Sequence, residues 1–96
     1  MNQVPEDIKK LVQAEKIILS KKSKEFVQYG FFTINDLIHC IFHGRVYKKE
    51  RDELEQAKYK YTIVGPAISG ELMYSCGKII TYNSKKYFII TFHEVR

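Results

Sequence analysis

The stretch that decides the fold runs from Gly77 to His93 and reads GKIITYNSKKYFIITFH. Two runs of β-branched and aromatic residues flank a polar Asn83-Ser84 pair, which is typical of a β-hairpin with a two-residue turn. Because side chains alternate along a strand, one face of the second run should hold three apolar residues, Phe88, Ile90 and Phe92. We expect this face to pack against helices. The opposite face, which holds Tyr87, Ile89, Thr91 and His93, should carry any chemistry.

Length and composition predict one domain, residues 1–96, with a single core. No apolar run approaches the roughly 20 residues needed to span a bilayer, and the N-terminus has no signal-peptide pattern. We therefore predict a cytoplasmic protein that does not contact membranes, with Cys40 and Cys76 as reduced thiols. The net charge of +5 favours an anionic partner.

The segment before the hairpin predicts helices. Pro5 suits a first helical position, and Ile8, Leu11 and Val12 form one helical face. Residues 16–19 fit either an extension of this helix or a short strand, and we favour the strand because of the resemblance described below. Ser20 is a suitable N-cap for a second helix over residues 21–29 that ends at Gly30.

The third helix has the clearest pattern. Thr33 and Asp36 resemble a capping box, and Gly44 is a stop signal. The i, i+3, i+4, i+7, i+8 spacing of a helix face that packs on a core is present at Ile34, Leu37, Ile38, Ile41 and Phe42. Strands should follow near residues 45–48, 59–64 and 71–76. The highly charged segment 49–58, between the first two, should form a solvated loop or a helical turn. We therefore predict an α+β fold, with two to three N-terminal helices and a short strand packed on one face of about four antiparallel strands.

Several blocks resemble a small uncharacterised bacterial domain family. They are IKKLV at 8–12, KIILS at 16–20, FVQYGFFTINDL at 26–37, HGRV at 43–46, YTIVG at 61–65 and FIITF at 88–92. That family is similar to the RelE, BrnT and MqsR toxins of toxin-antitoxin systems. The resemblance implies a compact RelE-like or barnase-like ribonuclease fold, and a cognate antitoxin that is a small zinc-finger or helix-turn-helix protein.

The chain departs from the family pattern at several positions. Members usually begin the second helix with His-Ala and carry two later arginines, whereas the matching positions here hold Lys21-Lys22, Glu25 and Tyr29. A further family histidine falls near Met73. These departures leave open whether the chain is an enzyme or a catalytically silent relative.

Metal-independent RNA cleavage needs a base, an acid and cations for the phosphate charge. His93 is a candidate acid or base because histidine titrates near neutral pH. With a two-residue turn it would stand opposite Tyr74, and Tyr74, Tyr82 and Tyr87 are candidate proton donors or base-stacking groups. The candidate phosphate-binding cations are Lys21, Lys22, Arg45, Lys78, Lys85 and Lys86. The same residues also fit a solvated strand surface without chemistry.

A second constellation lies on the third helix. Asp36, His39, Cys40 and His43 should share its polar side, and His39 and His43 have the i, i+4 spacing that can hold a metal ion. Polar residues opposite a core stripe are also the ordinary pattern of an amphipathic helix. We predict no metal and no cofactor. The function predicted is an endoribonuclease toxin acting on RNA, or alternatively a silent RNA-binding or protein-interaction domain.

Overall fold

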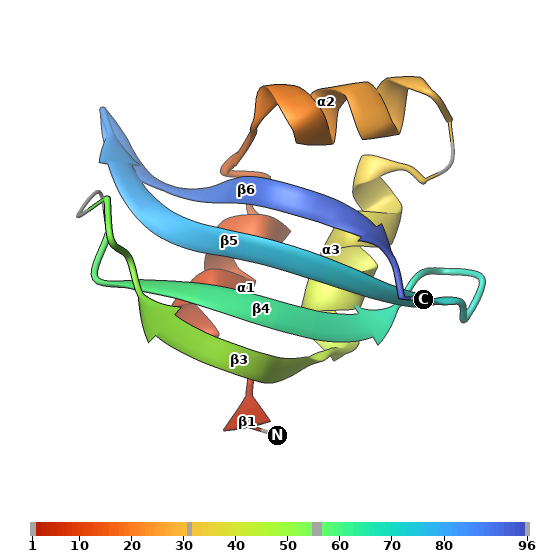
Figure 1. Cartoon of the computed structure of the whole chain (residues 1–96), viewed down its shortest axis with the longest axis horizontal. Coiled ribbons are helices and arrows are strands. Elements are labelled where there is room, and N and C mark those ends of the chain that lie inside the picture. Colours follow the sequence, from red (N-terminus) through yellow and green to blue (C-terminus); the bar gives the residue numbers. More distant parts are fainter. Residues whose placement is uncertain (1, 31, 55–56, 96) are drawn as a thin grey trace.

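The computed structural model describes residues 2–30, 32–54 and 57–95. Along the chain the elements are β1 (Asn2–Gln3), α1 (Glu6–Gln13), β2 (Ile17–Leu19), α2 (Lys21–Gln28), α3 (Ile34–His43), β3 (Arg45–Arg51), β4 (Tyr59–Pro66), β5 (Leu72–Tyr82) and β6 (Ser84–Glu94). The strands form one sheet in the order β1-β3-β4-β5-β6-β2, in which β2 is parallel to β6 and all other neighbours are antiparallel (Figure 1).

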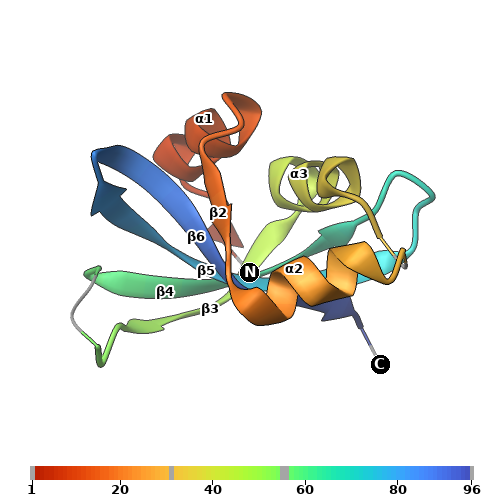
Figure 2. The same ribbon diagram turned by 90° about the horizontal axis from the view of Figure 1, so that it is seen from above.

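The predicted α+β class is confirmed, and so is the short strand before α2. Helices α1 and α3 lie on one face of the sheet, whereas α2 lies beside β6 at the β2 end (Figures 1 and 2). The described residues form six strands rather than about four, with β1 before α1 and β2 between α1 and α2. β1 was missed because two residues carry no periodic pattern. No helix in the described ranges is long and apolar enough to cross a membrane.

The core lies between the sheet and the two helices that cover it. Ile8 and Val12 of α1, and Leu37 and Ile41 of α3, are fully buried there. A capping box between Thr33 and Asp36 starts α3, as predicted. The buried side of α3 is rotated from the predicted stripe, because Cys40 is fully buried while Phe42 is 37% exposed.

Glycines explain that rotation of α3. A Cβ atom built at Gly44 or Gly65 would overlap the backbone carbonyl of Cys40. Since neither residue has a side chain, the backbone of α3 can lie directly against the start of β3 and the end of β4. At this close approach Cys40 is buried against the sheet, while Phe42 is exposed.

The β5–β6 hairpin has a shorter turn than the sequence predicted. Tyr82 pairs with Ser84, and Asn83 alone connects the strands with a φ of 64°, which asparagine tolerates well. Farther along, Gly77 pairs with Ile89 but Cys76 pairs with Thr91, so Ile90 is an extra residue in a β-bulge.

The bulge changes which side chains of β6 face the core. Tyr87 and Ile89 are fully buried, and beyond the bulge Phe92 is buried as well, with 2% exposure. The prediction that Phe88 and Ile90 face the helices was therefore wrong, and the prediction for Phe92 was right. The extra residue shifts the alternation by one position partway along the strand.

A buried ion pair joins β5 to the segment that follows β3. Lys78 Nζ lies 3.1 Å from Asp52 Oδ2, and the two side chains are 2% and 1% exposed. The Asp52 carboxylate also accepts hydrogen bonds from the backbone N–H groups of Leu54 and Ala57. The prediction that Lys78 binds phosphate was wrong, because its ammonium group is buried against this carboxylate.

The ion pair between Lys78 and Asp52 should make the stability of the fold depend on pH in the acidic range. Burial alone raises the pKa of Asp52, but the hydrogen bonds from Lys78, Ala57 and Leu54 outweigh it and hold the pKa below the ordinary 3.8. A carboxyl with a depressed folded-state pKa stabilises the fold above its unfolded pKa and loses this contribution as pH falls through the folded value.

We therefore predict that Asp52→Asn unfolds at a lower temperature than the wild type at pH 7, because Lys78 is left buried without a counter-ion. The difference should shrink as the pH falls below the ordinary 3.8 and through the lower folded-state pKa of Asp52, where the wild-type carboxyl itself becomes protonated. Thermal unfolding between pH 2 and 7 measures this, with the exposed neighbour Glu53→Gln as the control. A difference that is absent, or constant across this pH range, would contradict the role of the pair.

Candidate functional site

The N-terminus of α2 is fastened to the bulge of β6. The Ser20 hydroxyl donates to the Ile90 carbonyl at 2.8 Å, and the Ser23 hydroxyl donates to the Ile89 carbonyl at 3.2 Å. Ser20 also caps the helix by accepting a hydrogen bond from the Ser23 N–H. The bulge leaves the Ile90 carbonyl outside the β5–β6 ladder, so it is available to the Ser20 hydroxyl.

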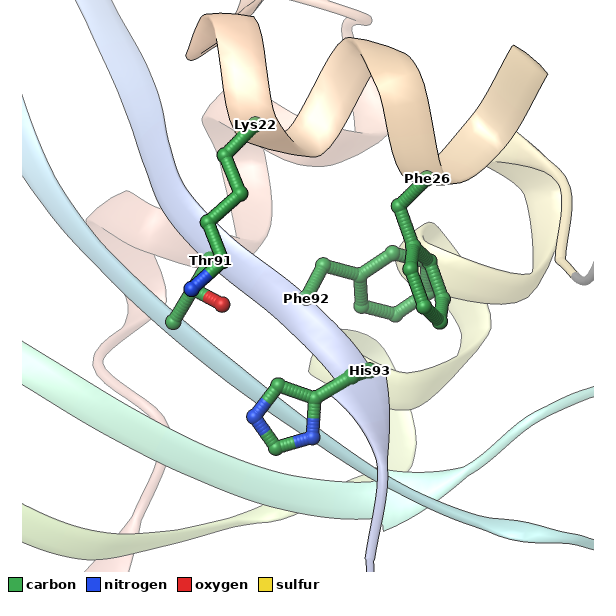
Figure 3. A pocket seen from close by; sticks show the side chains of 5 residues that line it. All are labelled: Lys22, Phe26, Thr91, Phe92 and His93. Atoms are coloured by element: carbon green, nitrogen blue, oxygen red, sulfur yellow. The ribbon is translucent and has the colours of Figure 1, made fainter. Parts of the chain in front are cut away.

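This contact sets one side of a pocket between α2 and β6. The pocket has a volume of about 320 Å³ and is lined by Lys22, Phe26, Thr91, Phe92 and His93. Figure 3 shows the side chain of Lys22 reaching from α2 across β6 to a position beside Thr91, with the imidazole of His93 farther along the same strand. The pocket thus presents a cation, a hydroxyl and an imidazole.

Aromatic rings form the inner wall of the pocket. The ring of Phe26 stands at 74° to that of Phe92, with centroids 6.2 Å apart. Phe32 stacks on Phe26 at 5.9 Å and contacts Phe92 at 6.0 Å. Because Phe32 and Phe92 are buried, this cluster makes a rigid base beneath the polar groups.

His93 is oriented by two neighbours. Its ring is stacked on Tyr74, with centroids 4.8 Å apart and planes at 14°. Its Nδ1 atom lies 2.7 Å from the Glu94 carbonyl oxygen. A carbonyl can only accept a hydrogen bond, so Nδ1 carries the proton and Nε2 holds the free lone pair of the neutral ring. The side chain is half-buried and still borders the pocket.

The predicted pairing of Tyr74 with His93 is confirmed, although the predicted turn was wrong. The shorter turn shifts the pairing of β6 with β5 by one residue, and the extra residue Ile90 in the bulge shifts it by one residue in the opposite direction. Of the predicted site residues, the structure brings together Lys22, Tyr74 and His93 at one end of β6. Lys21 is exposed beside Lys22 at the start of α2.

Three other predicted cations lie elsewhere. Arg45 is on β3, three strand positions from β6 and thus roughly 14 Å across the sheet. Lys85 and Lys86 lie beside the hairpin turn, at the end of β6 opposite His93, and the Lys86 ammonium donates to Ser84 Oγ. Lys85 and Lys86 therefore do not form one site with the pocket, whereas Arg45 lies in the same cross-strand row as Val64, Tyr74 and His93.

The prediction that Tyr87 is catalytic was wrong. Its side chain is fully buried against Gly77, and its hydroxyl has no hydrogen-bond partner among the described residues. Burial strongly raises the pKa of this phenol. Tyr82 is 65% exposed and borders a separate hollow with Ile80, Thr81 and Phe88 near the hairpin turn.

Two further candidate residues were not singled out by the sequence analysis, Phe26 as a pocket wall and Thr91 as a pocket hydroxyl. Phe26 was noted only within the block that resembles the family. No spacing pattern could have linked it to residues 91–93, because only the packing of α2 on β6 brings them together. Ser20 was predicted as a helix cap, but its bond to the Ile90 carbonyl carried no sequence signal.

The four-residue constellation on α3 does not form a metal cluster. Cys40 faces the core, where burial raises the pKa of its thiol to about 12. Asp36 uses its carboxylate for the capping box and for the backbone N–H of Ile68. Within the described ranges no three His, Cys, Asp or Glu side chains are grouped closely enough to hold a metal ion.

Comparison of the chain with models of protein families, with curated proteins and with solved structures finds no match.

If the bond between Ser20 and the bulge positions α2, Ser20→Ala should lower the free energy of unfolding by about 1–2 kcal/mol, because a helix cap and a hydrogen bond are lost together. Urea titration measures this, with the exposed Ser84→Ala as the matched control. A Ser20→Ala protein as stable as the wild type would show that α2 is held by its apolar contacts alone.

Proposed function

We propose that the chain is a metal-independent endoribonuclease that acts on RNA at the pocket between α2 and β6. The observation that carries this proposal is the His93 imidazole, with its free Nε2 lone pair, at a pocket that also holds the Lys22 ammonium group. With the Tyr74 phenol stacked on His93 as an acid, these groups supply the base, acid and cation that metal-independent phosphodiester cleavage needs.

The chemistry follows from the protonation state of His93. Its Nε2 atom would take the proton of a ribose 2′-OH while the 2′-oxygen attacks the adjacent phosphorus. The bond from phosphorus to the 5′-oxygen then breaks, and that oxygen takes a proton from the imidazolium or from the Tyr74 phenol. Lys22, joined at the start of α2 by Lys21, would stabilise the charge that develops on the phosphate oxygens.

We further propose that the protein is the toxin of a type II toxin-antitoxin system with a RelE-like or barnase-like fold. The order of helix, short strand, two helices and antiparallel strands supports this, as does the resemblance of the blocks given above. The net charge of +5 suits both RNA and an acidic segment of an antitoxin, since the same cations would pair with phosphates or carboxylates.

The enzyme proposal predicts that His93→Ala lowers the rate of RNA cleavage by roughly 10² to 10⁴, because proton transfer is lost. RNA affinity should stay near that of the wild type. Cleavage of a labelled RNA, with and without ribosomes, measures the rate, and Tyr29→Phe on the exposed end of α2 is the control. Expression of the wild type in a bacterial host should arrest growth, and expression of His93→Ala should not.

Two results would count against this proposal in different ways. If the wild type leaves RNA intact under both conditions and its expression is harmless, the protein is not a ribonuclease. If His93→Ala cleaves RNA and arrests growth as the wild type does, activity survives and the proton-transfer role belongs to another residue, with Tyr74 and Tyr82 as the next candidates.

The second candidate function is an RNA-binding domain without catalysis. It is favoured by the replacement of the His-Ala expected at the start of α2 by Lys21-Lys22, and by the presence of one imidazole among the residues that line the pocket. Lysines can hold phosphates but are poor proton-transfer groups at neutral pH unless their environment changes them. In this case the pocket would bind the backbone of RNA and leave it intact.

Both functions predict RNA binding that weakens as salt rises, because contacts to phosphates release counter-ions. Lys22→Ala should weaken binding and reduce the slope of log affinity against log salt by roughly one phosphate contact. Fluorescence anisotropy with a short single-stranded RNA measures this, and Lys10→Ala, an exposed lysine of α1, is the control. No binding at low salt would leave only a protein-interaction role.

A further inference from the structure

His39 and His43 form a second histidine site that the proposed function does not use. They lie on consecutive turns of α3, and their ring centroids are 4.4 Å apart with planes tilted by 46°. Two imidazoles that share a zinc ion, with bonds of about 2.0–2.1 Å, have ring centroids roughly 5 Å apart. The observed separation of the two rings is close to this value, and the His43 side chain is exposed.

The tautomer of His39 is already that of a metal ligand. Its Nδ1 atom lies 2.8 Å from the carbonyl oxygen of Pro66. Since a carbonyl only accepts, Nδ1 carries the proton and Nε2 presents its lone pair. Histidines that bind metals are commonly oriented by this kind of N–H donation to a backbone carbonyl. The end of β4 thus fixes the His39 ring before any ion arrives.

The surroundings favour a cation without supplying a third ligand. The Asp36 carboxylate lies one turn before His39 and interacts with it electrostatically, while its oxygens are held by Thr33 and by the Ile68 N–H. Cys40 points into the core. The described residues therefore offer two imidazole nitrogens, one nearby negative charge, and positions on the ion that remain open to water.

We propose that His39 and His43 chelate one divalent transition-metal ion of the group that prefers imidazole, Zn²⁺, Ni²⁺ or Cu²⁺. The sequence alone led us to predict no metal, because polar residues opposite a core stripe are the ordinary pattern of an amphipathic helix. The structure adds the Pro66 contact that fixes the His39 tautomer. The site shares no residue with the pocket at α2 and β6. A test of metal binding at His39 and His43 is therefore independent of the proposed ribonuclease activity.

The experiment is calorimetric titration of the tag-free full chain with Ni²⁺ in a buffer that contains no competing amine. We expect one ion per chain. His39→Ala and His43→Ala should each weaken binding by roughly 10²-fold, because loss of either ring removes the advantage of binding through two linked ligands. His93→Ala removes the remaining histidine and should bind Ni²⁺ as the wild type does.

Several results would overturn the proposal. They are the absence of binding to the wild type, binding that His43→Ala leaves unchanged, and binding that His93→Ala weakens as much as the α3 variants do. Because His43 is exposed, His43→Ala should keep the wild-type circular dichroism spectrum and unfolding midpoint. A loss of Ni²⁺ binding in that variant can then be assigned to the missing ligand rather than to a misfolded helix.

Discussion

The bulge at Ile90 is the constraint on which the candidate pocket depends. It breaks the regular pairing of β5 with β6, and the carbonyl of the extra residue accepts a hydrogen bond from the Ser20 hydroxyl. The same serine starts α2, so the helix that carries Lys22 and Phe26 is fastened to the strand that carries His93. One backbone irregularity thus links two segments that are about 70 residues apart in the sequence.

The bulge also determines which side chains of β6 face the core and which face the pocket. Before it, Tyr87 and Ile89 face the core, and after it the alternation shifts so that Phe92 faces the core and His93 does not. Without the extra residue, His93 would fall on the same face as Tyr87. The stacked contact with Tyr74 across the strand pair then holds the imidazole ring in a single plane.

The elements were predictable from sequence where local patterns are strong. The capping residues Thr33 and Asp36 marked the start of α3, and β-branched runs marked β5 and β6. The inward faces were harder to predict, because they depend on long-range events that no local pattern records. Gly44 and Gly65 let α3 rotate Cys40 inward, and the bulge shifted the inward positions of β6.

In the candidate site, too, local patterns were predictable from sequence and long-range contacts were not. The pairing of His93 with Tyr74 was predicted from a two-residue turn, and it holds only because the shorter turn and the bulge shift the register in opposite directions. Lys78 could not be separated from the other lysines, since its burial depends on Asp52 in the segment that follows β3. A lysine in a strand looks the same in the sequence whether its ammonium group meets solvent or a buried carboxylate.

The most direct test of this account is to map RNA onto the folded protein by NMR. A short 2′-O-methyl RNA cannot be cleaved through its 2′-oxygen, so binding can be followed in ¹H–¹⁵N spectra without turnover. The account predicts that the largest shift changes fall at Lys22, Phe26 and residues 91–93, with a smaller effect at Tyr74. Changes confined to β3 or to the hairpin turn near Lys85, with the pocket unaffected, would contradict it.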